Sequence, residues 1–255
     1  MVKENKTKKY LLYASGEIIL VVIGILIALQ INNWNENRKN RSLEHIFISR
    51  LLDDIKEEES FILTYIDYNN KVRDFTKRVN EHFINPELAL KTPKQSLIDF
   101  YQASQYSDVR QTASTYKELN TSGQINLIRN DDLRTALISF YELDWSNSNI
   151  FNHPKKYREN LRSLMPSDIQ NKIRANCGDI YIKTKSSIAV KLPNNCQIEL
   201  NDDIAKIALK NLLNDSELKK NLNFLIGNIH SKLGLVKNIK GKLKELKIEL
   251  EENKQ

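Results

Sequence analysis

The segment YLLYASGEIILVVIGILIALQINNW, residues 10–34, decides the architecture of this chain. Its centre, residues 18–31, carries no charge and has one polar side chain, Gln30. As a helix, residues 10–34 would be about 37 Å long, which exceeds the roughly 30 Å hydrocarbon core of a bilayer. The sequence therefore predicts a transmembrane helix at 10–34, between a basic N-terminal arm (1–9) and a helical extracytoplasmic domain (35–255).

A cleaved secretory signal also begins with lysines and has an apolar centre, and a buried helix of a soluble protein can be equally apolar. Cleavage requires two small residues two positions apart after the centre, but Ala28 is followed by LQINNW. The missing cleavage site favours a retained membrane anchor over these two alternatives.

Positive charges flank the segment on both sides, so their number alone does not set its orientation. Four lysines lie in the arm before it, and Arg38, Lys39, Arg41 and Arg50 follow it. A short lysine-rich arm is typically retained in the cytoplasm, whereas a long C-terminal domain is translocated largely regardless of its charge. We therefore expect a single-pass protein of the inner membrane, with its N-terminus in the cytoplasm and its C-terminal domain in the periplasm.

Two stretches of the chain resemble a known family. The string GEIILVVIGILIALQINNWNE, residues 16–36, is similar to the N-terminal hallmark of a domain-of-unknown-function family of single-pass membrane proteins of Bacteroidetes bacteria. The string TYKELNTSG at 115–123, followed by LIRN at 127–130 and FY at 140–141, is similar to a second stretch of that family. The resemblance implies a helical extracytoplasmic domain without an assigned activity, and it does not extend to the region of the cysteines.

The rest of the chain has the pattern of a mostly α protein. Neither proline nor glycine occurs between Gln30 and Phe83, so the transmembrane helix is expected to continue as a long stalk. Apolar residues recur along the stalk mostly every three, four or seven positions, which indicates one buried face. Prolines, a glycine and capping residues then divide the chain into shorter helices. We expect these helices at 94–106, 111–121 and 130–143, between Pro154 and Pro166, and at 202–213.

A final helix at 216–252, capped by Ser216, has a coiled-coil-like heptad pattern with Lys232 as its single exception. The seam residues are Leu222, Leu225, Ile229, Val236, Ile239, Leu243, Leu246 and Leu250. The first half is apolar over a wide arc and is expected to be buried, whereas the lysine-rich second half is expected to be largely solvated. Gly227, Gly234 and Gly241 recur every seven residues, which indicates either close approach of another helix or chance spacing.

The two cysteines of the chain, Cys177 and Cys196, lie at the outer ends of a region (176–200) with strand-like composition. Two β-branched or aromatic runs, 180–182 and 188–192, are separated by Lys-Ser-Ser and predict a small β-hairpin. A disulfide between the cysteines would suit an oxidising compartment and would stabilise the fold by about 3 kcal/mol. Two free buried thiols are the alternative.

Glu17 is a charged residue at the edge of the apolar centre. Helical spacing places it on one stripe with Gly24 and Ala28, where small residues would let a second transmembrane helix approach closely. Alternatively, Glu17 lies at the lipid headgroups, because the apolar centre begins directly after it.

Catalytic and metal-binding patterns are not found in the sequence. The four histidines are scattered singly, and Cys-x-x-Cys spacing does not occur. Seven glycines provide no phosphate-binding loop or nucleophile elbow. Acidic runs such as Glu57-Glu58-Glu59 lie beside basic residues on expected helices and indicate solvated faces or helix caps. These observations predict a protein that is not an enzyme and has no cofactor.

The net charge of +7 comes from basic residues that are interleaved with acidic ones, which argues against nucleic acid as a partner. Anionic lipid is the better candidate. If the last helix returns antiparallel to the stalk, Lys240 and Lys244 would approach the bilayer near Arg38, Lys39 and Arg41. Alternatively, these lysines only solvate the outer face of the helix.

The function that follows from these patterns is a membrane-anchored interaction or scaffold module, with a protein partner or a second copy bound through the transmembrane or stalk helix. The alternative is a sensor-like ligand-binding bundle that acts through a partner protein. Such a bundle would need a cavity lined by polar groups.

Overall fold

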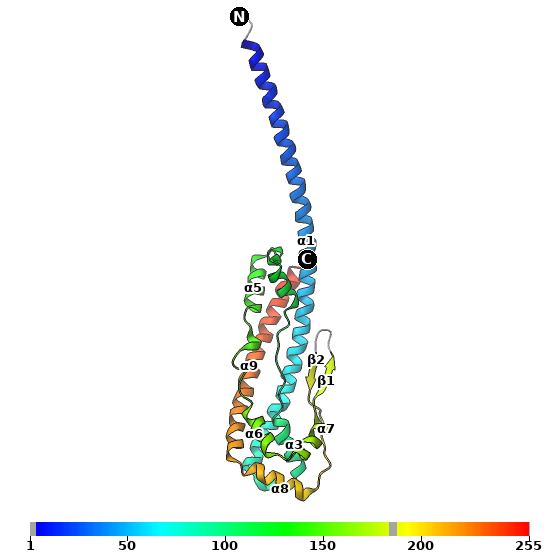
Figure 1. Ribbon diagram of the computed structural model, residues 1–255, viewed down its shortest axis with the longest axis vertical. Coiled ribbons are helices and arrows are strands. Elements are labelled where there is room, and N and C mark those ends of the chain that lie inside the picture. The colour runs from blue at the N-terminus through cyan, green and yellow to red at the C-terminus, as the bar shows by residue number, and fades with distance from the viewer. Residues whose placement is uncertain (1–3, 184–187, 255) are drawn as a thin grey trace.

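The computed structural model describes residues 4–183 and 188–254 and is mostly helical, as the sequence predicts (Figure 1). A long N-terminal helix, a long C-terminal helix and a two-stranded hairpin are its main features. The elements are α1 (Glu4–Ile84), α2 (Pro86–Ala89), α3 (Pro93–Ala103), α4 (Ser114–Thr121), the 3-10 helix η1 (Gln124–Leu127), α5 (Asp131–Tyr141), the 3-10 helix η2 (Trp145–Asn147), α6 (Lys156–Leu164), α7 (Ser167–Cys177), β1 (Ile180–Lys183), β2 (Ile188–Lys191), α8 (Asp202–Leu213) and α9 (Ser216–Glu252).

Helix α1 is continuous over 81 residues and has two parts with different surroundings. Its first part projects alone from the body of the protein (Figure 1), and the apolar side chains between Tyr10 and Trp34 are exposed. From Phe47 onward, one face of the helix is buried. Within the described residues, α1 is the one helix that is long and apolar enough to cross a membrane, judged by length and composition.

Local sequence signals explain most of the helix boundaries. Pro86 and Pro93 stand at the first positions of α2 and α3, where a missing N–H costs nothing. Gly123 follows α4 with a φ of 69°, which is the left-handed conformation that favours glycine. Asn130 caps α5 by accepting hydrogen bonds from the backbone of Asp132 and Leu133, at 3.0 and 3.1 Å.

Three differences from the expected boundaries have simple causes. The cap of α9 is Asp215, whose Oδ1 accepts from the backbone N–H of Leu218 at 2.6 Å, so Ser216 is the first helical residue instead of the cap. The helices expected at 94–106 and 111–121 are shorter, because residues 105–113 form an irregular segment across the bundle. Helices α2 and α7 were not expected: α2 is a single turn in the segment expected to be a connector, and Pro166 was expected only to end the preceding helix.

Helix α9 returns antiparallel to α1 and packs along it. Its first residues join a core cluster with Val79 and Phe83, and its last residues join one with Phe47 and Leu51. The expectation of a largely solvated second half is correct for its lysine-bearing face, where Lys237, Lys242 and Lys244 are exposed, but wrong for its seam. The side chains of Val236, Ile239, Leu243, Leu246 and Leu250 are all no more than 3 % exposed. A narrow apolar stripe is enough to bury this seam, because α1 and α5 both pack against it.

The core consists of three clusters that follow one another along α1. The first joins α1 to α4, α5 and the end of α9, and the second joins the end of α1 to α3, α6, α7, α8 and the start of α9. The third lies between them and includes Tyr68, Val72 and Leu192. Each cluster contains residues of α1, so this helix is the spine of the body.

The predicted hairpin is present. Strands β1 and β2 are antiparallel, with Ile180 opposite Lys191 and Tyr181 opposite Val190. The hairpin lies beside α1 (Figure 1), where Ala189 is buried while the side chains of β1 remain exposed. Its expected Lys-Ser-Ser turn falls at 185–187, outside the described residues.

The three regularly spaced glycines of α9 do not mark a close approach within the chain. A Cβ atom added at Gly227, Gly234 or Gly241 would meet nothing within 4 Å. Alanine would therefore fit at all three positions.

The buried second half of α9 gives a direct test by a matched pair of substitutions. Leu246→Ala should lower the free energy of unfolding by about 2 to 5 kcal/mol, because it leaves a cavity in the first cluster. Ile248→Ala, at a position that is 46 % exposed, should cost less than about 1 kcal/mol. Urea unfolding of the full chain in detergent measures both values. Equal effects of the two substitutions would show that this half is not packed as described.

Candidate functional site

The candidate site is an open groove of about 410 Å³ between α6 and the first half of α9. Figure 1 shows α6 beside this half of α9, at the end of the body remote from the projecting part of α1. Four separate segments line the groove. The lining residues are Asn69, Ser104, Gln105, Tyr106, His153, Pro154, Lys155, Lys156, Tyr157, Arg158, Glu217, Lys220, Asn221, Phe224, Leu225, Asn228, Ile229 and Lys232.

The local sequence explains why the basic residues face this groove. Tyr157 and Leu161, four residues apart, are 3 % and 0 % exposed and fix α6 in the second core cluster. Tyr157 also donates a hydrogen bond to the backbone oxygen of Phe100 at 3.2 Å. The residues that flank Tyr157 at the start of α6 therefore border the groove.

Positive charge dominates the groove. Five lysine and arginine residues line it, whereas Glu217 is the single acidic residue in the lining. The basic residues are Lys155, Lys156, Arg158, Lys220 and Lys232. Among the described residues, none of these five side chains belongs to an ion pair. Asp108 and Asp179 act on Lys232 and Arg158 from nearby, but basic side chains still outnumber acidic ones in the lining.

Two of the cations lie against the ring of Tyr106. The Nζ atom of Lys155 is 3.5 Å from the ring centroid, and the guanidinium carbon of Arg158 is 5.1 Å from it. Arg158 also donates hydrogen bonds to the backbone oxygen of Ser104 at 3.0 Å and to Oε1 of Gln105 at 2.8 Å. Arg158 is therefore held in place by the irregular segment that follows α3.

Lys232 lies on the opposite wall, in α9. Burial lowers the pKa of its ammonium group, the positive charge of Lys155 lowers it further, and Asp108 partly offsets both effects. Lys232 is also the one basic residue in the apolar seam of α9. The break in the heptad pattern therefore coincides with the groove.

Apolar and amide side chains complete the lining. Leu225 and Ile229 form part of the apolar lining, and Phe224 is 76 % exposed at the edge. Asn69 and Asn221 are only 5 % and 8 % exposed. Nδ2 of Asn69 donates to the backbone oxygen of Tyr65 at 2.8 Å, whereas the side chain of Asn221 forms no hydrogen bond among the described residues. The groove thus offers apolar surface, an excess of basic side chains, and the amide group of Asn221, which no other described side chain occupies.

Sequence reasoning did not identify this groove, because its walls come from segments that are far apart in the chain. Two signals were present. The run Lys155-Lys156-Tyr157-Arg158 places three cations around one aromatic residue, and Lys232 interrupts an otherwise apolar seam.

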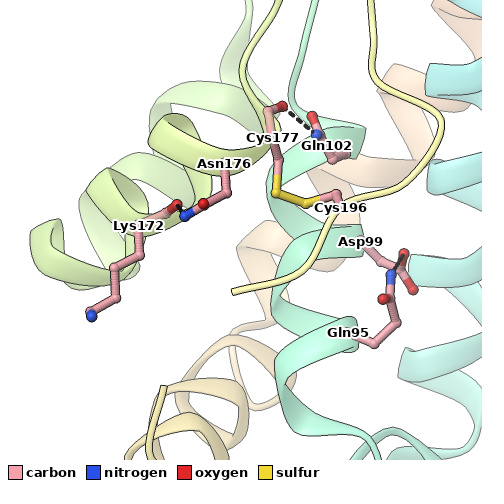
Figure 2. Close-up of a disulfide and its surroundings, with 7 residues drawn as sticks. All are labelled: Gln95, Asp99, Gln102, Lys172, Asn176, Cys177 and Cys196. Atoms are coloured by element: carbon pink, nitrogen blue, oxygen red, sulfur yellow. Dashed lines mark hydrogen bonds between the residues drawn. A yellow bond between two sulfur atoms is a disulfide. The ribbon is translucent and has the colours of Figure 1, made fainter. Parts of the chain in front are cut away.

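The two cysteines are bonded in the structure, with their Cα atoms 5.2 Å apart (Figure 2). Cys177 ends α7 and is fully buried, and its backbone oxygen accepts a hydrogen bond from Nε2 of Gln102 at 2.7 Å. The bond therefore ties the segment after the hairpin to α7, while the Gln102 contact ties α7 to α3.

The buried carboxylate Asp99 lies close to this disulfide (Figure 2). It accepts hydrogen bonds from Nε of Arg78 at 3.0 Å and from Nε2 of Gln95 at 3.1 Å, and Nε2 of His82 lies 3.0 Å from its Oδ2. Its oxygens are thus satisfied by neighbouring side chains, which is the arrangement of a structural carboxylate.

The residues singled out in the apolar segment lie apart from the groove. Glu17, Gly24 and Ala28 are all in the exposed part of α1, and a Cβ atom at Gly24 would meet nothing within 4 Å. Their proposed contact with a second helix stays a prediction.

The structure separates the two groups of basic residues that were expected to face lipid. Arg38, Lys39 and Arg41 lie within about 10 Å of Trp34 along α1. Lys240 and Lys244, by contrast, precede Lys247, which pairs with Glu59 at 3.2 Å. About 37 Å of helix separates Glu59 from Trp34. This distance is several times the roughly 10 Å range of an exposed charge in salt, so it argues against lipid contact by Lys240 and Lys244.

Glu58 is a buried acid that sequence reasoning treated as part of a solvated face. Its side chain faces the first cluster, where Oε2 accepts from the backbone N–H of Thr112 at 2.6 Å. Its other oxygen, Oε1, is buried without a hydrogen-bond partner among the described residues. Burial raises the pKa of Glu58 to about 7, although the hydrogen bond from Thr112 and the charge of Arg110 act in the opposite direction.

This raised pKa predicts a pH dependence of stability. The folded state prefers the protonated form of Glu58. The stability that protonated Glu58 contributes is therefore fully present below its ordinary pKa of 4.5 and is lost as the pH rises through about 7. In the parent protein, the free energy of unfolding should fall by roughly 3 kcal/mol as the pH rises from 4.5 to about 7. Glu58→Gln should abolish this fall, because glutamine does not ionise. Urea unfolding at several pH values, followed by the fluorescence of buried Trp145 in a Trp34→Phe background, measures the slope.

The control for this experiment is Glu87→Gln, which removes an exposed carboxylate and should leave the slope unchanged. An unchanged slope in Glu58→Gln itself would show that another group causes the dependence.

Comparison with known proteins gives one match. Residues 17–172 match the model of a family of unknown function, DUF6090. No curated protein and no solved structure matches the chain. The matched range contains most of α1 and one wall of the groove, and it ends before Cys177 and before α9, which forms the other wall. Because the match covers more than half of the chain, the protein belongs to the DUF6090 family of unknown function.

Proposed function

We propose that this protein is a single-pass, membrane-anchored helical module of the inner membrane, whose body lies in the periplasm and serves as an interaction or scaffold unit. The observation that carries the proposal is the continuity of α1, which runs without a break from the exposed apolar segment into the core of the body. The resemblance to single-pass membrane proteins of Bacteroidetes supports the same assignment.

A continuous helix would hold the body at a defined height. From Trp34 to Phe47, the first buried residue of the core, α1 rises by about 20 Å. A flexible linker would instead leave the distance and the orientation of the body undefined. This rigid connection suits a protein that presents a surface to partners at a fixed distance from the membrane.

Two features support the proposed orientation. The N-terminal arm contains four lysines, which favours its retention in the cytoplasm. The bond between Cys177 and Cys196 is of the kind that persists in an oxidising compartment such as the periplasm.

Within this proposal, the partners are lipid and protein. Arg38, Lys39 and Arg41 would lie near anionic headgroups, and the stripe of Glu17, Gly24 and Ala28 would contact a partner helix or a second copy. Nucleic acid, enzymatic activity and a cofactor are not part of the proposal.

A second candidate function is favoured by the groove. A sensor-like ligand-binding bundle requires a cavity with polar groups, and the groove between α6 and α9 has this character. In this case, the bundle would transmit binding through a partner protein.

The orientation is tested with reporters fused after Gln255. An enzyme that is active only outside the cytoplasm should be active there, because the body is expected to be exported. The matched control is the same fusion to residues 35–255, which lacks the apolar segment and should be silent.

When thiols are blocked before lysis, the full chain should show free thiols only after reduction. Activity of a cytoplasm-specific reporter after Gln255, with the export reporter silent, would reverse the orientation.

A further inference from the structure

On the basis of the second candidate function, we propose that the groove between α6 and α9 binds a small organic anion that carries an apolar or aromatic body. Its acidic group, a carboxylate or a phosphate, would lie between Lys155 and Lys232, and its apolar part would lie against Tyr106 and Phe224.

The charge of the groove is the first reason. Lys155 directly precedes α6 and Lys232 lies in α9, and their charges act on each other across the groove. Together with Lys156, Arg158 and Lys220, they face a single lining carboxylate, that of Glu217. Bringing like charges together is unfavourable unless a counter-charge is present, so an anion in this position would stabilise both walls.

The nature of the lining is the second reason. Lys155, Lys156 and Lys220 are exposed, whereas Lys232 is half-buried, and all four border the apolar surface of Tyr106, Leu225 and Ile229. Lys155 already contacts the face of Tyr106. Phe224 is one turn of α9 from Asn221 and exposes an aromatic ring that packing within the chain does not require. Ligand sites combine apolar surface with a few converging polar groups in this way.

The buried amides are the third reason. Asn221 is 8 % exposed and has no hydrogen-bond partner among the described residues, yet it borders the groove. The polar atoms of Asn221 are not among the fully buried atoms that lack a partner, so they remain open to the groove and can bond to a ligand atom there. The side-chain oxygen of Asn69, whose Nδ2 is already used, offers a further acceptor at the same place.

The position and size of the groove restrict the ligand. Asn69 lies about 50 Å along α1 from Trp34, which is beyond the reach of a headgroup in a bilayer around residues 10–34. The ligand would therefore come from the aqueous compartment. A volume of about 410 Å³ lies in the range of small-molecule sites.

The test uses the full chain in lipid nanodiscs, with empty nanodiscs as the blank, and isothermal titration calorimetry as the measurement. The probes are 2-naphthoate, 2-naphthyl phosphate and the neutral 2-naphthamide, which share one aromatic body. At least one of the two anions should bind about tenfold or more tightly than the amide, because hydrogen bonds to charged groups are the stronger ones. The preferred anion identifies the acidic group, carboxylate or phosphate, and its affinity should fall with added salt.

The variant for this test is Lys155→Gln combined with Lys232→Gln, which should weaken binding of the anion about tenfold or more while leaving that of the amide unchanged. Lys237→Gln, an exposed lysine of α9 outside the groove, is the matched control and should bind as the parent does. Circular dichroism confirms that all variants are folded.

The outcomes distinguish this proposal from the function on which it rests. One outcome is that the amide and the anions bind equally well and that Phe224→Asp abolishes the binding of all three. This outcome would contradict the preference for an anion but would still support a ligand-binding bundle. Absence of binding by all three probes to the folded protein would contradict both. Binding that is insensitive to Lys155, Lys232 and Phe224 would also overturn the proposal, because the site would lie elsewhere.

Discussion

The antiparallel packing of α9 against α1 is the interaction on which the rest of the structure depends. The two helices share all three core clusters, and the shorter helices fill the space on either side of them. Where the seam of α9 is apolar, as at Val236 and Leu243, the side chains are buried against α1. Where Lys232 replaces an apolar residue, the contact opens into the groove. One pair of helices thus determines both the stability of the body and the position of its candidate site.

The continuity of α1 links this packing to the proposed role. Because the spine of the body and the apolar segment are parts of one helix, a change in the packing around α1 would be passed to the apolar segment without an intervening hinge. The groove contacts α1 through Asn69, so a ligand there would touch the spine directly. A ligand-dependent signal would therefore need no element other than α1 to reach a partner near the membrane.

Sequence reasoning predicted most of the fold, because the relevant signals are local. The break of the long helix before Pro86, the cap of α5 at Asn130, and the uninterrupted helix before Phe83 depend on residues close together in the chain. The buried second half of α9 was missed, because a narrow stripe can be covered by several neighbours that the sequence does not identify. The burial of Glu58 and the groove were missed for the same reason, since both depend on the irregular segment after α3 and on contacts between distant segments.

The central claim is that α1 is rigid from the apolar segment into the core. The most direct measurement is the distance between spin labels at Asn33 and Ser60 by pulsed electron paramagnetic resonance, with the full chain in nanodiscs. Both positions are exposed, so the labels should not disturb the packing. One continuous helix predicts a single narrow distribution centred near 40 Å, from about 1.5 Å per residue. A broad distribution, or one centred at a much shorter distance, would show a hinge between the apolar segment and the body and would contradict the account.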